Sequence, residues 1–498
     1  MIGNLAAGIE ILLTPTNILL IMFAVIVGIV AGAIPGFTGT NTVAIVLPFT
    51  LAMTPETAIV FMAAIYVGAN YGGAIPAALI NTPGTAGATA TVLDAYPMSK
   101  KGKAGQAIGI SILASGIGGI ISAIVIVALL NPLGSVALMF GQPEYFALAL
   151  FGIIALASVL GENVRKGLIS GLLGLLIAAV TLDPITGQSR LDFGFPELVS
   201  DVPFVPIIVG LFAISELMYL IKKRQISDAD FDISSMSEVK KGAKQVLARP
   251  FQTLRAISIG TLIGAIPGAG TSVANFISWG EAKRASDKPE EFGDGSPEGV
   301  IASEGSNNAV TSSSLLPTLV LGIPGSGTTA VMLGALLLHG IQPGPNLMAE
   351  FGAEATAIML SLLIANLVLI AFAFAISKYI VRVVLLPTEW LVPVILVLTA
   401  IGIFSLNNSL FEVRFMILFG ILGFIMREYD YSLIPMVLGV ILGPLAEGAF
   451  RRTLELGNGD VTLFFINSPI TVILWVLIVA VFFSDHISRF FKSLLSRV

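Results

Sequence analysis

Long apolar segments that lack any charged side chain dominate this chain. Each is long enough to cross the hydrocarbon core of a bilayer at least once, because a membrane-spanning helix needs roughly 20 apolar residues. Runs such as IVIVALL and FAVIVGIV are apolar at every position, which predicts helices and not strands of alternating polarity. Segments without Asp, Glu, Lys or Arg include residues 11–55, 57–93, 104–143, 305–349 and 461–484.

Composition agrees with this pattern. The 498 residues are 55% hydrophobic and 11% charged, with a mean hydropathy of +0.94, whereas soluble chains carry about 25% charged residues. Because the chain has no cysteine and only two histidines, disulfides, cysteine metal sites and histidine-rich metal sites are excluded. We therefore predict an all-α polytopic membrane protein of roughly 10–12 spans plus hairpins, with no bound cofactor or metal and no nucleic-acid partner.

The chain also contains an internal repeat. GAIPG at Gly32 returns at Gly264, 232 residues later, and NTPGTAG returns as GIPGSGT, with Pro83 matching Pro324 after 241 residues. Two Pro-Gly motifs in the same order indicate a duplication. The sequence predicts two homologous repeats, each with helices that are broken or re-entrant.

Basic residues indicate how the repeats are oriented. Lys and Arg concentrate in 222–255, and the positive-inside tendency places such a segment in the cytoplasm. An outside N-terminus would then give the first repeat an odd number of spans, so the second repeat would be inverted, as is common in secondary transporters. The predicted domains are the N-terminal membrane repeat 1–221, the basic cytoplasmic linker 222–255, the C-terminal membrane repeat 256–465, and an extra terminal helix with a cytoplasmic tail, 466–498.

Four Pro-Gly breaks interrupt the apolar segments, and small hydroxyl residues follow each. Irregular backbone at membrane depth persists only where it lines a cavity or is buried in protein. A helix that begins after such a break offers free N–H groups and a positive dipole end to a carboxylate, and neutral oxygens suit Na⁺. Candidate substrate-binding residues are Gly36, Thr38, Thr40, Asn41, Thr82, Gly84, Thr85, Gly268, Thr271, Ser272, Gly325, Ser326 and Thr328. Candidate cation-binding residues are Asn81, Asn307, Asn308 and Thr329.

Other interpretations of these residues stay open. Gly, Ser and Thr also let membrane helices pack closely, and any single hydroxyl here can have that role alone. Asp94 and Glu304 flank the breaks and are candidates for proton or cation sites, although the sequence around Asp94 equally indicates an interfacial turn. His339 is expected at a helix end, and a hydrolase built from Ser326 and His339 has no support from the repeat.

Two long strings resemble the TctA family, the large membrane subunit of tripartite tricarboxylate transporters. They are GAIPGFTGTNTVAIVLPF, which continues to NTPGTAGATATVLDAYPMSKKGKAGQAI, and GAIPGAGTSVANFISWGEAKRAS, followed by PEGVIASEGSNNAVTSSSLLPTLVLGIPGSGTTAVMLGAL. The resemblance spans 32 to about 444. It implies a multi-pass protein of the bacterial inner membrane that works with a TctC-type periplasmic substrate-binding protein and a small TctB-type membrane subunit.

The predicted function is therefore cation symport of organic carboxylates, of the tricarboxylate or dicarboxylate type, with no enzymatic activity and no catalytic residues. The acid-poor, oxygen-rich breaks favour Na⁺ over H⁺ as the coupling ion, and the repeat suggests an elevator-like motion. The alternative is a permease or channel for organic anions that needs no binding protein.

Overall fold

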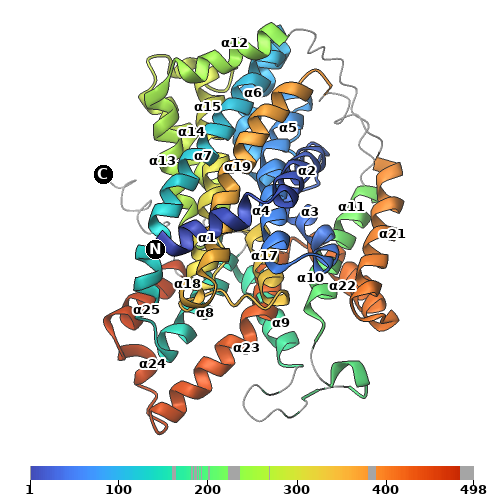
Figure 1. Cartoon of the computed structure of the whole chain (residues 1–498), viewed down its shortest axis with the longest axis vertical. Helices are drawn as coiled ribbons and strands as arrows, with labels where there is room; N and C mark the ends of the chain where they lie inside the picture. The colour runs from blue at the N-terminus through green and yellow to red at the C-terminus, as the bar shows by residue number, and fades with distance from the viewer. Residues whose placement is uncertain are drawn as a thin grey trace, which may run out of the picture. The chain divides into compact units, whose positions relative to one another are not determined.

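Helices make up every regular element in the part of the chain that the structure describes (Figure 1). The computed structural model describes residues 2–159, 164–180, 183, 188, 190–191, 193–199, 202–222, 236–268, 270–379 and 388–482. Among these described residues, six helical segments are long and apolar enough to cross a membrane: Pro15–Gly32, Pro55–Ile80, Ala86–Ala137, Phe204–Lys222, Gly352–Ile376 and Leu433–Leu456. The all-α polytopic class is confirmed. The total of 10–12 spans stays a prediction, since the remaining apolar helices are shorter.

The first half of the chain runs from α1 to α11. Its helices are α1 (Ile2–Leu12), α2 (Pro15–Gly32), α3 (Gly39–Val46), α4 (Pro55–Gly72), α5 (Ala74–Ile80), α6 (Thr89–Met98), α7 (Ala104–Ala137), α8 (Gln142–Val159), α9 (Val164–Ala178), α10 (Phe204–Val209) and α11 (Ser215–Lys222), with the short turns η1 (Leu47–Ala52), η2 (Ala86–Ala88), η3 (Ser99–Lys103), η4 (Pro196–Leu198) and η5 (Gly210–Ile214).

The second half follows a similar order of helices. It contains α12 (Met236–Leu247), α13 (Pro250–Gly264), α14 (Gly270–Ala285), η6 (Pro289–Glu291), α15 (Pro297–Ser313), α16 (Leu315–Leu321), α17 (Gly327–Leu338), α18 (Leu347–Glu350), α19 (Gly352–Ile376), α21 (Thr388–Asn407), α22 (Leu410–Glu428), α23 (Leu433–Leu456), α24 (Leu463–Ile466) and α25 (Pro469–Phe482).

Helix ends show the repeat in backbone detail. Helix α5 ends at Asn81 (φ 58°) and α16 ends at Gly322 (φ 71°), and each of these residues donates its N–H to the carbonyl of the proline five residues earlier. Beyond α2 and α13, Gly36 (φ 83°) and Gly268 (φ 81°) adopt the same left-handed conformation, which favours glycine. The two halves thus share helix order and cap geometry. Their inverted orientation stays a prediction.

Packing divides the chain differently from the repeat. One compact unit, unit 1, comprises Met1–Gly134 and Ile208–Phe424, and the other, unit 2, comprises Ser135–Ile207 and Ile425–Val498. Each unit draws on both halves. The predicted domains 1–221, 222–255, 256–465 and 466–498 follow the repeat, and they stay a prediction.

Unit 1 is held together by close approach of small residues. Helix α2 packs on α4, and α13 packs on α15 in the second half. A Cβ added at Gly32 would lie 2.1 Å from the carbonyl oxygen of Ala69, and one added at Gly28 would lie 2.4 Å from that of Ile65. Glycine therefore permits a backbone-to-backbone contact that any larger residue would prevent, as is typical of membrane helices.

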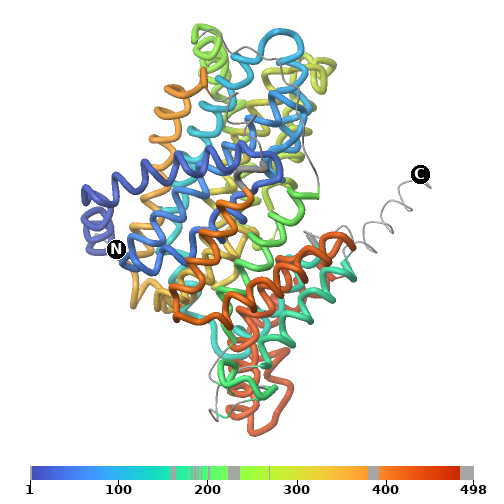
Figure 2. Tube along the Cα trace, turned by 90° about the vertical axis from the view of Figure 1, so that its right-hand side faces the viewer, coloured from blue at the N-terminus to red at the C-terminus, as the bar shows by residue number. Residues whose placement is uncertain are grey.

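In unit 2, α23 packs against α8 and α9, and α25 packs against α8 (Figure 2, red against blue-green). Buried Glu144, at the start of α8, accepts hydrogen bonds from Ser468 (2.7 Å), Asn467 (3.0 Å) and Thr471. Two arginines, Arg451 and Arg190, form ion pairs with Asp183 and Glu447.

Two predicted segments contain helices that the structure describes in part. The predicted linker includes α12 and the start of α13; Gln106 of α7 donates to Glu238 of α12 at 2.6 Å, and residues 223–235 lie outside the described part. The predicted terminal helix corresponds to α25, while the tail from residue 483 lies outside the described part.

Candidate functional site

The four Pro-Gly breaks all lie in unit 1. We call them the first break (33–38), the second break (81–88), the third break (265–268) and the fourth break (322–326). Hydroxyl side chains start two of the helices that follow: Thr38 accepts the N–H of Asn41 at the start of α3, and Ser326 forms a reciprocal capping box with Thr329 at the start of α17. These caps satisfy part of each helix N-terminus, so the remaining free N–H groups belong to the first helical residues.

Contacts between the breaks run crosswise between the two halves. Thr40, just after the first break, lies 3.0 Å from Thr328, just after the fourth break, oxygen to oxygen. Ser272, just after the third break, donates to the carbonyl of Ala86 in the second break at 2.8 Å, and Asn275 donates to the carbonyl of Gly87 at 2.5 Å. The first break therefore meets the fourth, and the second meets the third.

Buried polar side chains of α4 and α15 lie between these pairs. Tyr66 places its hydroxyl 3.0 Å from Ser326 and 3.3 Å from Ser314. Asn70 donates to Thr311, and Asn307 donates to the carbonyl of Asn70 at 3.4 Å. All of these side chains are buried, so the two helices form a continuous polar contact inside an apolar bundle.

Several predicted residues take part in this arrangement. Asn41 is buried and donates to Glu216 of α11 at 3.0 Å. A Cβ added at Gly36 would lie 3.3 Å from the same carboxylate, and one added at Gly84 would lie 2.2 Å from the carbonyl of Gly32. The predicted residues of the crosswise contacts are Thr40, Ser272 and Thr328, with Thr271, Asn307 and Ser326 beside them. The others lie within a break or at the start of the helix that follows it: Gly36, Thr38, Asn41, Gly84, Thr85, Gly268 and Gly325.

Other predicted residues have different surroundings. Asn81 is exposed and ends α5, while the hydroxyl of Thr82 donates to the nearby carbonyl of Ile80. Asn308 donates to Asn366 of α19 at 3.2 Å. Thr329 uses its hydroxyl within the capping box of α17. Of the predicted cation ligands outside the second break, Asn307 is the one whose side chain reaches it, next to Gly87.

Four residues that make these buried polar contacts were not predicted from the sequence: Tyr66, Asn70, Glu216 and Thr311. Tyr66 and Asn70 lie one helical turn apart on α4, within an otherwise apolar, fully buried segment. Polar residues four apart on a membrane helix lie on one face, and they seldom face lipid. The four-residue spacing of Tyr66 and Asn70 could therefore have identified these two residues from the sequence.

Asp94 binds the backbone of the charged loop that precedes α15. Its Oδ1 accepts the N–H groups of Gly293 (2.8 Å), Gly295 (3.1 Å) and Ser296 (2.8 Å), and its Oδ2 accepts the indole N–H of Trp279 at 2.6 Å. Asp94 is fully buried within α6, and the chain turns a few residues later, at Lys101 and Gly102, where the lysines are exposed. The interfacial position of this turn stays a prediction. Four donors already satisfy this carboxylate, which makes it an anchor for the loop.

His339 caps the C-terminus of α17, as expected for a helix-end residue, and lies 3.1 Å from the hydroxyl of Thr50. Ser326 caps the N-terminus of the same 12-residue helix. The length of that helix, about 18 Å, separates the two side chains. They cannot form a catalytic pair.

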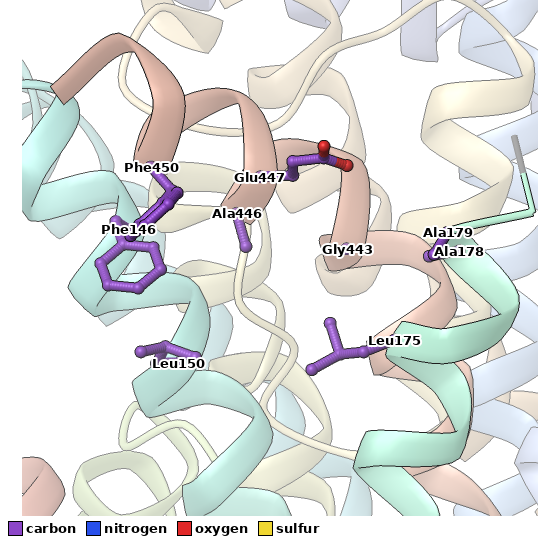
Figure 3. Close-up of a pocket in the computed structure, with 9 residues that line it drawn as sticks. All are labelled: Phe146, Leu150, Leu175, Ala178, Ala179, Gly443, Ala446, Glu447 and Phe450. Atoms are coloured by element: carbon purple, nitrogen blue, oxygen red, sulfur yellow. The ribbon is translucent and has the colours of Figure 1, made fainter. Parts of the chain in front are cut away.

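A cavity of about 230 Å³ lies in unit 2, among α8, α9 and α23 (Figure 3). Its lining is apolar except for Glu447, which pairs with Arg190 at 2.9 Å. None of the predicted site residues lines it. Within the described residues, no group of three His, Cys, Asp or Glu side chains could hold a metal ion.

The fold and the breaks define a class of protein: a polytopic helical membrane protein of two similar halves, with polar residues from broken helices buried in an apolar bundle. Residues 18–438 match the family model described as the tripartite tricarboxylate transporter TctA family. The chain belongs to this family and is a component of a membrane transporter. The resemblance found in the sequence is confirmed.

Two relatives from Agrobacterium vitis are similar to this chain. A 52.8 kDa protein of the TAR-I ttuC' 3' region is 36% identical over 470 residues, which cover 94% of this chain and 93% of the relative. A protein of the TAR-II ttuC' 3' region is 38% identical over 208 residues, which cover 42% of this chain and 86% of the relative.

Proposed function

We propose that this chain is the large membrane subunit of a binding-protein-dependent secondary transporter that imports organic carboxylates by cation symport. The observation that carries this proposal is the crosswise contact between breaks of opposite halves. It brings helix N-termini from both halves close to one another inside one unit, and transporters of repeated architecture bind substrate at such positions.

Neutral groups would hold the carboxylate. The breaks carry no Lys or Arg, so free N–H groups at the starts of α3 and α17 and the hydroxyls of Thr40 and Thr328 are the available donors. Helix N-termini favour anions without a salt bridge. The carboxylate would be of the tricarboxylate type that the family's description names, or of the dicarboxylate type.

A cation gradient would drive uptake. Buried oxygens without a partner in the described structure include Oδ1 of Asn307 and Oδ1 of Asn275, and both side chains lie next to Gly87 of the second break. Hard cations such as Na⁺ take neutral oxygens of this kind, so Na⁺ is the first candidate at the breaks. Because all four breaks lie in unit 1, an elevator-like movement of this part of the protein is our mechanistic proposal.

The partners and location follow from the family. A TctC-type periplasmic binding protein would deliver the substrate, a TctB-type small membrane subunit would complete the complex, and the bacterial inner membrane would contain it. Uptake into proteoliposomes tests this: the complete complex should accumulate a carboxylate only when loaded binding protein is present. Equal uptake without the binding protein would favour the alternative, an independent permease or channel.

A further inference from the structure

Helix α12 is an amphipathic helix that packs against α7 through one face. The buried residues of that face are Val239, Gly242, Ala243 and Val246. An added Cβ at Gly242 would collide with the carbonyl oxygen of Gln106 on α7, so the two backbones are in contact. Gln106 also accepts a hydrogen bond from Gln245 at 2.9 Å. Helix α12 is therefore fixed in place, where it runs across the end of α6 and α7 (Figure 1).

The opposite face of α12 carries positive charge. Lys240, Lys241 and Lys244 are exposed there. Lys241 pairs with Glu238 at 3.8 Å, whereas the side chains of Lys240 and Lys244 have no hydrogen-bond or ion-pair partner among the described residues. Like charges four residues apart lie on the same face and disfavour a helix. The pair therefore indicates a counter-charge that comes from outside the described structure.

A third lysine without a partner borders α12. Lys103 ends η3 and is exposed, and its side chain also has no partner in the described part of the chain. Two residues later, Gly105 of α7 lies against Glu238 of α12, where an added Cβ would lie 3.0 Å from the Cβ of Glu238. Lys103 and α12 therefore lie at the same end of α7. We call Lys103, Lys240 and Lys244 the lysine surface.

Exposed apolar side chains adjoin the lysine surface. Leu247, three residues after Lys244 and on the same face, is 64% exposed, and Phe251 in the first turn of α13 is 85% exposed. Residues 251–277 contain a single charged side chain, Arg255, which pairs with Glu281 at 4.0 Å. Further exposed apolar residues of α13, α14 and the third break are Leu254, Leu262, Ile266, Val273, Phe276 and Ile277. An outer face of this composition is suited to contact with acyl chains.

The combination of charge and apolar area favours a phospholipid as the occupant. Amphipathic helices with lysines on the polar face and Leu or Phe beside them lie in the headgroup region of a bilayer. Lysines at that depth attract anionic headgroups. A soluble polyanion such as RNA would neutralise the lysines but would leave Leu247 and Phe251 in water. An anionic phospholipid supplies a phosphate to the lysines and an acyl chain to these two side chains.

We propose that the lysine surface binds the headgroups of anionic phospholipids, with Leu247 and Phe251 in the adjoining acyl-chain region. Each ammonium group donates hydrogen bonds to phosphate oxygens, and no covalent step is involved. The lysine surface contains no residue of the four breaks, so the inference goes beyond the proposed function and does not depend on which ligand is transported.

A fluorophore placed on α12 tests the proposal in the complete chain. The chain has no cysteine, so Ala248→Cys, at an exposed position next to Leu247, provides a single site for labelling. The labelled protein is reconstituted into phosphatidylcholine vesicles that contain a small fraction of brominated phosphatidylglycerol or, in a parallel sample, brominated phosphatidylcholine. Brominated phosphatidylglycerol should quench the fluorophore more strongly, because each lysine near the surface enriches an anionic lipid by up to about fivefold.

Variants of the lysine surface give the decisive comparison. Lys103→Gln/Lys240→Gln/Lys244→Gln should be quenched equally by the two brominated lipids. The matching triple arginine variant keeps the charge and should keep the wild-type preference for phosphatidylglycerol. A preference that survives the glutamine variant would overturn the proposal, as would equal quenching by the two lipids in the wild type.

Lys166→Gln/Lys283→Gln/Lys288→Gln is the matched control, because it removes the same charge from lysines that have partners. Those partners are the carbonyl of Tyr429, the ring of Trp279 and the carboxylate of Glu291. This variant should keep the wild-type preference. If it lost the preference to the same extent as the glutamine variant of the lysine surface, net charge alone would explain the enrichment and the proposal would be overturned.

Two further outcomes would identify a different counter-charge. Excess glycerol phosphate at matched ionic strength should leave the preference unchanged; its loss would mean that the lysines bind a soluble phosphate and not a lipid. Three acids precede α12 in the sequence, Asp228, Asp230 and Asp232. If their replacement by Asn created a preference that the wild type lacks, those acids would be the counter-charge and the proposal would be overturned.

The quenching measurement needs no transport, so it separates this inference from the proposed function. A protein that transports a carboxylate but shows no preference for phosphatidylglycerol would overturn the inference and leave the proposed function standing. A protein that shows the preference but transports no carboxylate under any gradient would overturn the proposed function and support the lipid site.

Discussion

Gly87 offers a sharp perturbation of the contact between the second break and Asn307. A Cβ added there would lie 2.2 Å from Asn307 Oδ1, 3.1 Å from Asn307 Cγ and 3.1 Å from Thr271 Cβ. The φ angle of Gly87 is not in the left-handed region, so alanine is compatible with its backbone. Any effect of Gly87→Ala must therefore come from the added methyl group and its neighbours.

The structure sets the size of this effect. Ordinary van der Waals contact begins at 3.4 Å, so the amide oxygen of Asn307 must retreat from 2.2 Å by about 1.2 Å. Overpacking of this kind costs about 1–3 kcal/mol. If the cost falls on the binding-competent arrangement, the apparent affinity for the carboxylate should fall by between about 5-fold and 150-fold.

Initial uptake rates at a series of carboxylate concentrations measure this loss. Gly280→Ala on α14 is the control, because an added Cβ there meets no atom within 4 Å. Asn307→Ala removes the obstructing amide, so the double variant Gly87→Ala/Asn307→Ala should recover at least about 1 kcal/mol relative to the sum of the two single effects. Equal behaviour of Gly87→Ala and Gly280→Ala, or strict additivity in the double variant, would refute the inferred contact.

Three further predictions concern other parts of unit 1. Asp94→Asn keeps one oxygen as acceptor for the backbone N–H groups but places an NH₂ group against the indole N–H of Trp279, so two donors face each other. The free energy of unfolding should fall by about 1.5–3 kcal/mol. An unchanged unfolding temperature in detergent would contradict the anchor role. Thr40→Val and Thr328→Val should each weaken carboxylate binding by about 1 kcal/mol, and the double variant should lose less than the sum of the two single losses because the two hydroxyls share one hydrogen bond; strictly additive losses would contradict that hydrogen bond. The hydrogen bond from Arg284 holds the pKa of Glu281 below its usual range, so the unfolding-temperature difference between wild type and Glu281→Gln should be present at neutral pH and vanish as the pH falls through that folded-state pKa. A difference in unfolding temperature that persists in acid would contradict the stabilising role of the Glu281–Arg284 pair.

Part of the site was predictable because proline and glycine determine local backbone geometry. Proline removes a hydrogen-bond donor and ends a helix, and glycine tolerates the left-handed turn that follows. Both effects are local, so the breaks at Gly36 and Gly268 were found from the sequence, and the structure gives both residues a positive φ. The resemblance between the halves likewise depends on matching sequence motifs, shifted by 232 residues at GAIPG and by 241 residues at the second Pro-Gly motif.

Comparison of the two repeats explains why Asn81 follows α5. Its polar side chain next to a Pro-Gly motif suggested an ion ligand, but its counterpart 241 residues later is Gly322. Glycine at the matching position indicates a requirement for positive φ, which Asn meets more readily than other side chains. Both residues are left-handed helix caps, so comparison of the two copies separates a backbone requirement from a ligand.

The crosswise contacts could not be predicted, since they depend on how the halves pack in three dimensions. Spacing along the chain relates the first break to the third and the second to the fourth, whereas the contacts join the first to the fourth and the second to the third. The matched residues Asn70 and Thr311 contact each other where α4 meets α15. Positions that correspond in sequence therefore meet at this central contact.

Crosswise contact has a consequence for how transport would be coupled. If each break contacted only its own half, a carboxylate bound at one pair of helix N-termini could leave the other pair undisturbed. Because each pair contains one break from each half, a relative movement of α4 and α15 changes both pairs at once, and Asn70, Thr311 and Asn307 lie at the contact between these helices. One rearrangement can therefore alter the proposed carboxylate site at Thr40 and Thr328 and the proposed cation site at Asn275 and Asn307 together, and such differential affinity for two states is what links the movement of one ligand to that of another.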